Sequence, residues 1–248
     1  MNLNIFTSPA AVVTALSNEL QLLSKSDRAR HISLSGGSTP QLWFELLAQP
    51  PYSKDICWKN LHFWWCDERC VPAKSPESNF GVADTLLFRH IDIPRENLHR
   101  IHGEESPEQE ALRYTDEINS NVPKNSAGVP VFDWIHLGMG VDGHTASLFP
   151  GHTDYTDTRW ITTARHPESG QKRISKTARL LMAGRRLTYL VLGKDKAHMM
   201  KELQRNLEKE GQKKDALPWP AAKISSTAGI TEWYLDQPAA SLLAFAEK

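Results

Sequence analysis

The stretch FDWIHLGMGVDGH, residues 132–144, sets an apolar run directly before a glycine-rich turn that ends in an acid and a histidine. Three other apolar runs lead into polar clusters in the same way. HISL (31–34) precedes SGGSTP, LHFWW (61–65) precedes CDER, and LTYLVL (187–192) precedes GKDK. Short apolar runs bounded by turn residues are typical of buried strands, so we expect a strand at each of the four.

Helix-like stretches alternate with these runs. Segments of this kind cover residues 41–48 and 198–207. Near the N-terminus, apolar residues recur at helical spacing, at Val12, Leu16, Leu20 and Leu23. The alternation predicts an α/β fold, a three-layer Rossmann-like domain with a mostly parallel sheet and helices on both faces. Ligands of such sheets bind beyond the carboxyl ends of the strands, where the polar clusters of this chain fall, so we expect an enzyme.

The composition argues against a broad electrostatic partner. The chain has 248 residues with 29 basic and 29 acidic side chains, so its formal net charge is zero. No field of one sign is available to attract nucleic acid or an anionic membrane surface, and we expect neither partner. Positive charge that meets an anionic substrate is therefore expected to be concentrated in a site.

We expect one cytoplasmic domain, residues 1–248. The cysteines form no C-x-x-C pair, which favours reduced thiols over disulfides or a zinc knuckle; they are Cys57, Cys66 and Cys70. The N-terminus does not resemble a signal peptide, and no apolar run approaches the roughly 20 residues that cross a membrane. Polar segments at 106–109, 119–128 and 210–215 are interpreted as surface loops rather than domain linkers.

SGGSTP, Ser35–Pro40, follows a predicted strand and opens a predicted helix. Gly36 and Gly37 let a ligand approach the backbone closely, and Ser38 or Thr39 can cap the helix, with the proline in its first position. The free amides and the helix dipole then form an anion site, most naturally for a phosphate. A tight, well-capped turn without a ligand is the alternative.

CDER, Cys66–Arg69, brings two acids and a base to the end of a tryptophan-rich strand. A carboxylate there, such as Asp67, can orient a substrate hydroxyl or a catalytic group. Arg69 can bind an anion or a developing oxyanion. The alternative is a plain ion pair at a strand terminus.

The glycines of GMGVDGH match the G-x-G-x-x-G pattern of dinucleotide sites. That pattern requires a full crossover helix, whereas HTASLF is expected to form under two helical turns before Pro150 stops it. We therefore expect no nicotinamide cofactor. The glycines are better explained by a sharp turn that exposes Asp142 and His144. An imidazole in such a turn can take a proton from water and pass it to a leaving group.

Two further basic clusters are candidates for phosphate binding. GKDK places Lys194 and Lys196 at a strand-to-helix turn, and Arg173 lies in QKRIS. Lysines at a helix start oppose the helix dipole, which disfavours a purely structural role. No H-E-x-x-H or comparable ligand spacing occurs, so no metal is expected.

Together these segments resemble the bacterial 6-phosphogluconolactonases, of the glucosamine-6-phosphate deaminase and ribose-5-phosphate isomerase fold group. The resemblance runs through LSGGSTP, WWCDERCVP with SPESNFGVADTLLF, FDWIHLGMGVDGHTASLFPG, RRLTYLVLGKDKAHMMKEL and ITEWYLDQPAAS. It implies hydrolysis of 6-phospho-D-glucono-1,5-lactone, the second step of the oxidative pentose phosphate pathway, with no cofactor and no metal. The expected partner is this small sugar phosphate, and the expected assembly is a monomer or homodimer.

The resemblance also implies roles for individual residues. His144 is the expected general base and Asp142 its neighbouring helper, although Asp67 is an alternative for orienting the imidazole. Asp67 and Arg69 are expected at the sugar end. The phosphate is expected on the loop and two cations, namely Gly36, Gly37, Ser38, Thr39, Lys196 and Arg173, with Lys172 or Lys176 as alternatives to Arg173.

Three other functions compete with this one. A sugar-phosphate deaminase or isomerase of the same fold group opens an amino-sugar ring, but that family carries an aromatic residue in place of Arg69 and a different sequence after D-G-H. A sugar-phosphate sensor usually carries a DNA-binding segment, for which this chain has no room. A serine esterase acting through Ser35 would lack the usual G-x-S-x-G elbow.

Overall fold

The computed structural model describes residues 1–208 and 216–244 of the chain. The strands among these residues are β1 Leu3–Phe6, β2 Arg30–Leu34, β3 Leu61–Trp65, β4 Asp67–Arg69, β5 Leu98–His99, β6 Trp134–Gly138, β7 Ile161–Arg165, β8 Lys172–Lys176, β9 Arg186–Val191 and β10 Ile230–Asp236. All four predicted strands are therefore present, as β2, β3, β6 and β9.

Two sheets organise these strands. The larger has seven strands in the order β1-β10-β9-β6-β2-β3-β5, and every neighbouring pair is parallel. The smaller has the order β4-β8-β7 and is antiparallel, which the sequence did not predict. The four predicted strands are contiguous in the large sheet, as β9-β6-β2-β3, so the polar segments at their carboxyl ends are neighbours.

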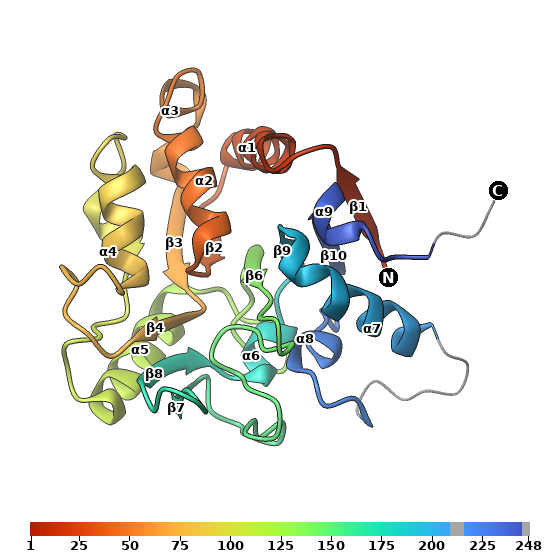
Figure 1. Ribbon diagram of the computed structural model, residues 1–248. Coiled ribbons are helices and arrows are strands. Elements are labelled where there is room, and N and C mark those ends of the chain that lie inside the picture. The colour runs from red at the N-terminus through yellow and green to blue at the C-terminus, as the bar shows by residue number, and fades with distance from the viewer. Residues whose placement is uncertain (209–215, 245–248) are drawn as a thin grey trace.

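Helices connect the strands (Figure 1). The α-helices are α1 Pro9–Ser24, α2 Ser38–Leu47, α3 Tyr52–Asp55, α4 Asn79–Ala83, α5 Pro107–Asn121, α6 Ala178–Met182, α7 Ala197–Leu207, α8 Pro220–Lys223 and α9 Gln237–Ala240. Short 3₁₀ turns are η1 Trp58–Asn60, η3 Arg95–Asn97 and η4 Lys194–Lys196, and η2 Asp84–Phe88 is a π-helical turn that continues α4. Among the described residues, no helix is long and apolar enough to span a bilayer.

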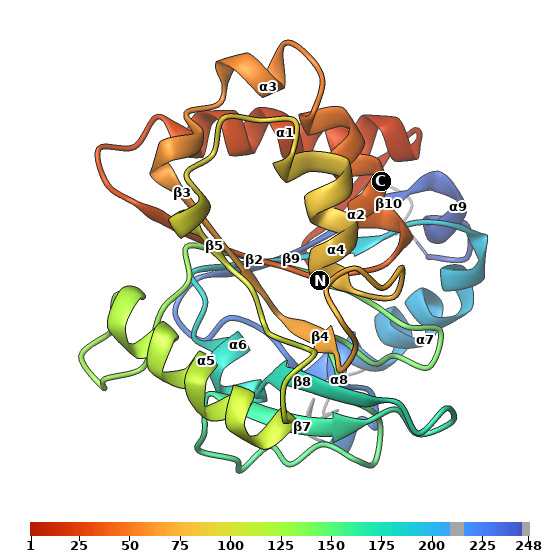
Figure 2. The same ribbon diagram turned by 90° about the vertical axis from the view of Figure 1, so that its left-hand side faces the viewer.

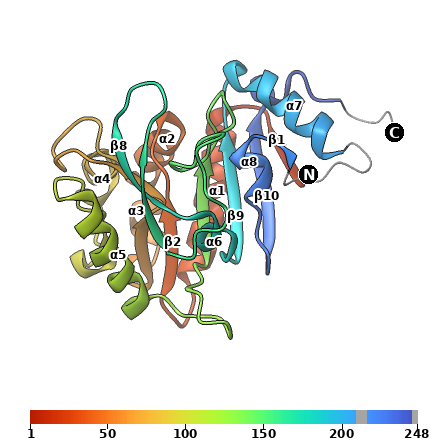
Figure 3. The same ribbon diagram turned by 90° about the horizontal axis from the view of Figure 1, so that it is seen from below.

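The elements form three layers, as the sequence predicts. Helices α1 and α2 lie on one face of the large sheet, and the small sheet lies on the other face with α5, α6 and α8 (Figure 2). From below, β8 and α6 lie in front of the large sheet (Figure 3). The small sheet therefore stands beside the carboxyl ends of the large one, where it can contribute side chains to a site.

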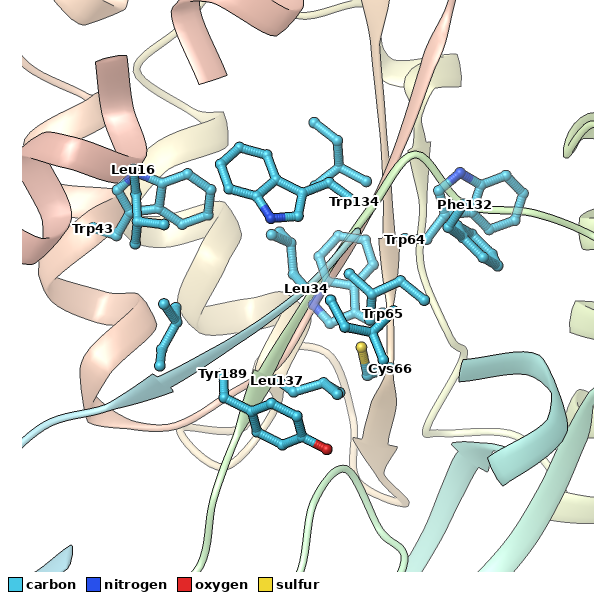
Figure 4. Packing of buried hydrophobic residues seen from close by; sticks show 14 of the residues in the cluster. Leu16, Leu34, Trp43, Trp64, Trp65, Cys66, Phe132, Trp134, Leu137 and Tyr189 are labelled. Carbon is cyan, nitrogen blue, oxygen red and sulfur yellow. The ribbon is translucent and has the colours of Figure 1, made fainter. Parts of the chain in front are cut away.

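Large aromatic side chains fill the space between the helices and the large sheet (Figure 4). Trp43 of α2, Trp64 and Trp65 of β3 and Trp134 of β6 are each at most 1% exposed. The rings of Trp43 and Trp134 lie 6.4 Å apart between centroids. Truncation of such a side chain to alanine costs about 3–5 kcal/mol, so the contact between Trp43 and Trp134 helps to fix how α2 lies on the sheet.

Several local predictions were wrong. Helix α2 begins at Ser38 with Gly37 as its N-cap, and neither Ser38 nor Thr39 caps it through a side chain, because the left-handed φ of +104° at Gly37 already turns the chain into the helix. Segment 106–109 is not a loop, because Pro107 begins α5, and α5 also includes the first residues of segment 119–128. Segment 210–215 lies outside the described residues.

A buried histidine, His31, and a half-buried one, His62, face each other across neighbouring strands. His31 of β2 and His62 of β3 are register partners with ring centroids 5.0 Å apart. Burial, helped by the charge of His62, lowers the pKa of His31 to about 4. Burial, helped by His99, also lowers the pKa of His62. The fold therefore holds both rings neutral at pH values where an unfolded chain protonates them.

We predict that the free energy of unfolding falls as the pH drops from about 6.5 towards 4, because the unfolded chain then binds protons that the folded chain refuses. His31 alone is expected to contribute about 2 kcal/mol of this loss between pH 7 and 5. Urea unfolding at the two pH values measures it. His31→Gln should flatten the dependence, whereas His198→Gln, on the exposed side of α7, should not. An equal slope in all three proteins would contradict the prediction.

Candidate active site

A cavity of about 230 Å³ lies where the two sheets meet. Polar segments from all four predicted strand ends contribute to it, and so does β8 of the small sheet. Its lining residues are Ser35, Gly36, Gly37, Asp67, Arg69, Asn79, Gly138, Met139, Gly140, His144, Ala146, Arg173 and Lys196. The predicted site residues Ser38 and Thr39 line an adjoining cavity of about 190 Å³, and Asp142 reaches the site through His144.

The turn after β6 is closed by its own backbone. Gly143 N–H donates to Gly140 O at 3.0 Å, and Gly140 N–H donates to His144 O at 2.9 Å. The hydroxyl of Thr145 donates a hydrogen bond to Gly138 O at 2.8 Å. The helix expected over HTASLF is absent, because Thr145 and Leu148 form an isolated bridge instead. The turn consequently exposes His144 on a compact frame.

His144 and Asp142 form a directed pair. Asp142 Oδ1 lies 2.6 Å from His144 Nδ1 and also accepts the His144 backbone N–H at 3.2 Å. Partial burial raises the pKa of the Asp142 carboxyl, but the hydrogen bonds and charge of His144 outweigh it, and the net pKa is lowered. An ionised Asp142 holds the proton on Nδ1 and leaves Nε2 as the basic nitrogen. Asp142, not Asp67, is thus the acid in contact with the imidazole.

Strand alternation divides the DER segment between two tasks. Asp67 and Arg69 line the cavity, whereas Glu68 between them is 1% exposed and faces α4. The Glu68 carboxylate accepts from the backbone of Asn79 and Phe80, from its neighbour Arg69 and from a serine hydroxyl, at 2.7–3.0 Å. Its burial raises the pKa of this carboxyl despite those bonds. Glu68 therefore anchors the strand on which the two cavity residues lie.

Arg173 lies opposite Arg69 in the register of β4 and β8. Both guanidinium groups line the cavity, and the Nε atom of each is buried without a hydrogen-bond partner among the described residues. Burial lowers the pKa of Arg173, while Asp67, whose Oδ2 is 3.9 Å from Nη1, opposes the change. Like charges at directly opposed positions are unfavourable, and an anion bound between the two guanidinium groups would relieve their repulsion.

The two lysine alternatives to Arg173 lie elsewhere. Lys172 is exposed, and Lys176 is fully buried below the cavity. The Lys176 ammonium donates to Trp65 O at 2.5 Å and lies 4.5 Å from the centroid of Phe132. Burial lowers the pKa of Lys176 to about 8. Among these three basic residues, Arg173 is the one that reaches the cavity.

The glycine loop and Lys196 form the other end of the site. Gly36, Gly37 and Lys196 line both cavities, whereas Lys194 is exposed and lines neither. The turn that carries the lysines is set by Gly193, whose φ is +94° and whose N–H donates to Asp236 Oδ1 at 3.1 Å. The start of α2 and one ammonium group are therefore close together, as an anion requires.

Two contributing residues were missed by the sequence analysis. Asn79 lines the cavity, donates to Asp67 O at 2.9 Å, and lies so near Gly36 that a Cβ there would be 1.8 Å from its Oδ1. Ser147, 2% exposed, donates to Asp67 Oδ2 at 2.7 Å. Both contacts join segments distant in the sequence, so no local pattern indicates them. The one local sign is Gly36 in SGGSTP, since a glycine lets another group, here the Asn79 side chain, approach the backbone closely.

Comparison with known proteins identifies the family. The family model for glucosamine-6-phosphate isomerases and 6-phosphogluconolactonase matches residues 7–233. The chain belongs to this family. It is 50% identical to the 6-phosphogluconolactonase of Haemophilus influenzae, over 98% of this chain and 100% of that protein. The family and the fold group expected from the sequence are thereby confirmed.

Solved structures agree with this assignment. The crystal structure of devB protein is similar with a TM-score of 0.93 and 51% identity, covering 98% of this chain and 99% of that one. A monomeric glucosamine-6-phosphate deaminase has a TM-score of 0.79 at 20% identity, covering 98% of this chain and 100% of that one. The second likeness concerns the fold alone. The chemistry of the two branches must therefore be distinguished by side chains.

We predict that Gly143→Ala damages the turn that carries His144 more than the same substitution damages an ordinary left-handed glycine position. Gly143 has a φ of +81°, and an added Cβ would lie 2.6 Å from Trp219. Gly170→Ala is the matched control, because its φ is +68° but nothing lies within 4 Å. The backbone strain of about 1–3 kcal/mol is common to both, so urea unfolding should show a larger loss for Gly143→Ala. Equal losses would mean that Trp219 does not restrain the turn.

Proposed function

We propose that the chain hydrolyses 6-phospho-D-glucono-1,5-lactone to 6-phospho-D-gluconate, the second step of the oxidative pentose phosphate pathway. The observation that carries this proposal is the Asp142–His144 pair, 2.6 Å apart, at a cavity that also presents Arg69, Arg173 and Lys196. A base beside concentrated positive charge suits an ester that carries a phosphate. The named 6-phosphogluconolactonase relative, 50% identical to the chain, supports the same activity.

In the proposed reaction, His144 Nε2 takes a proton from the water that attacks C1 of the lactone. The C1 carbonyl becomes a tetrahedral oxyanion, which Arg69 or the amides of the glycine turn stabilise. The intermediate collapses by breaking the bond between C1 and the ring oxygen. The imidazolium gives its proton to that departing oxygen, so His144 returns to its starting form. Asp142 keeps the tautomer and stabilises the transient charge.

At the other end, we propose that the phosphate is held by the glycine loop Gly36–Thr39, by Lys196 and by Arg173. Ionised partners make strong hydrogen bonds to phosphate oxygens, and amides at a helix start add to them. Holding the phosphate places C1 near His144, which converts binding energy into orientation. Asp67 lies among these groups and is proposed to accept a hydrogen bond from the sugar.

Three broader inferences accompany this function. We infer a single catalytic domain, because one hydrophobic cluster links the two sheets of the described residues. We infer a cytoplasmic enzyme, because Cys57, Cys66 and Cys70 are free thiols. We infer a monomer or homodimer acting on a small sugar phosphate, with no nucleic acid or membrane partner, which fits the net charge of zero.

A coupled assay tests the activity itself. Freshly prepared 6-phosphogluconolactone is supplied, and 6-phosphogluconate is followed against spontaneous hydrolysis. Glucosamine 6-phosphate, assayed for released ammonia, is the comparison substrate for the deaminase alternative. Lactone hydrolysis at the spontaneous rate would refute the proposal, and ammonia release would favour the deaminase.

We predict that His144→Ala lowers kcat by about 10²–10⁴-fold, because proton transfer to and from the reacting oxygen is lost. His152→Ala, an exposed histidine outside the cavity, is the matched control and should keep wild-type activity. Circular dichroism and thermal unfolding establish that both variants are folded. Retention of more than about a tenth of the wild-type rate by His144→Ala would refute the general-base assignment.

We predict that Lys196→Ala raises KM for the phosphorylated lactone by about tenfold or more, because a charged hydrogen bond to phosphate is lost. Lys194→Ala, two residues away but exposed, should leave KM unchanged. Turnover of unphosphorylated glucono-1,5-lactone should be alike in both variants and the wild type. A normal KM for the phosphorylated substrate in Lys196→Ala would exclude this role.

A further inference from the structure

Ser147 connects the two walls of the cavity. It lies three residues after His144, on the turn from the large sheet, and its hydroxyl donates to Asp67 Oδ2 of β4 at 2.7 Å. The Ser147 N–H in turn donates to Ser175 Oγ of β8 at 3.3 Å. The catalytic turn is thus joined to two strands of the small sheet through one residue that is 2% exposed.

The backbone before Ser147 adopts an unusual conformation to make this contact. Ala146 has a φ of +49°, and it is the non-glycine residue with a left-handed backbone among the described residues. Such a conformation is costly and persists where surrounding contacts require it, most often at functional sites. Ala146 lines the cavity while the next residue turns beneath it towards Asp67. The left-handed backbone of Ala146 therefore directs the Ser147 hydroxyl inward, towards Asp67.

One oxygen of the Asp67 carboxylate has a hydrogen-bond donor among the described residues, and the other has none. Ser147 occupies Oδ2, and Arg173 approaches the same atom at 3.9 Å. Oδ1 accepts no hydrogen bond from the described residues, although Asp67 lines the cavity and is 6% exposed. The other charged residues of the cavity lining are Arg69, Arg173 and Lys196, apart from His144. Asp67 is consequently the anionic acceptor that the lining offers to a hydroxyl.

We infer that Ser147 is a positioning residue, which fixes the rotamer of Asp67 so that Oδ1 accepts a hydrogen bond from a ring hydroxyl of the sugar lactone. The inference rests on the proposed lactonase function. A carboxylate held on one side cannot swing towards the guanidinium groups beside it. The substrate hydroxyl then finds Asp67 Oδ1 already oriented to accept its hydrogen bond. The bond between Ser147 and Asp67 also fixes the position of the His144 turn relative to the sugar.

The first test removes the hydroxyl. Ser147→Ala should lower kcat/KM for 6-phosphogluconolactone by about tenfold, the scale of a hydrogen bond to a charged group. Ser17→Ala is the matched control, because Ser17 is also buried but lies in α1 outside the cavity, where its hydroxyl donates to Val13 O and accepts from Trp43 Nε1. The control should match the wild type. Ser147→Thr, which retains a hydroxyl, should recover activity relative to Ser147→Ala.

The decisive measurement is a double-mutant cycle with Asp67→Ala, which removes the acceptor altogether. If Ser147 acts through Asp67, adding Ser147→Ala to Asp67→Ala should change kcat/KM by less than about twofold. A serine that merely supports the fold would reduce activity by the same factor in both backgrounds. Full additivity, or unchanged activity in Ser147→Ala, would overturn the inference. If Ser147→Ala does not fold, Ser147→Cys takes its place in the cycle, since its thiol is a weaker donor of similar size.

These experiments distinguish a failure of the Ser147 inference from a failure of the proposed lactonase function. The wild-type chain must first hydrolyse the lactone above the spontaneous rate, and failure there refutes the lactonase assignment. An active wild type with an additive cycle leaves the lactonase function intact and removes only the role of Ser147. An active wild type with a non-additive cycle supports both.

Discussion

The backbone of Cys66 joins the two sheets, and the position of the cavity depends on the hydrogen bonds that hold this residue. Its N–H donates to Leu34 O at 2.7 Å in the large sheet, and its carbonyl accepts from Lys176 N at 2.8 Å in the small one. Lys176 also turns its ammonium to the carbonyl of Trp65, just before the junction. Such a buried charge is tolerated only when it is well bonded, here with an aromatic ring beneath it. Asp67 therefore enters the cavity from a fixed backbone.

This junction gives the cavity two different walls. The parallel sheet contributes the segments that follow its strands. These are the glycine loop before α2, the lysine turn before α7 and the closed turn that carries His144. The antiparallel sheet supplies side chains at every second residue, namely Asp67 and Arg69 on β4, with Arg173 beside them on β8. A chain of zero net charge thus gathers Arg69, Arg173 and Lys196 around one cavity, which suits the proposed phosphorylated substrate.

The sequence predicts the first wall far better than the second. Apolar runs followed by glycine-rich or charged segments identify the strands of the large sheet, and their parallel order brings those segments together. The small sheet consists of short strands with mixed polarity, and β4 is only Asp67–Arg69, so its pairing has no local signature. The contacts of Asn79 and Ser147 are equally non-local. Capping of α2 was mispredicted because Gly37 turns the chain by its backbone, without the side-chain oxygen that Ser38 offered.

The side chains also bear on which reaction the shared fold carries out. Glucosamine 6-phosphate carries an ammonium group at neutral pH, and deamination must accommodate it beside the reacting ring. Here the cavity presents Arg69 opposite Arg173, and both have a buried nitrogen without a partner among the described residues. In the proposed arrangement Arg173 binds the phosphate, and Arg69 at the sugar end repels an ammonium but stabilises a carbonyl oxygen that becomes negative. The electrostatics of the small sheet therefore favour a neutral lactone with an anionic tail, on a fold that the deaminase shares.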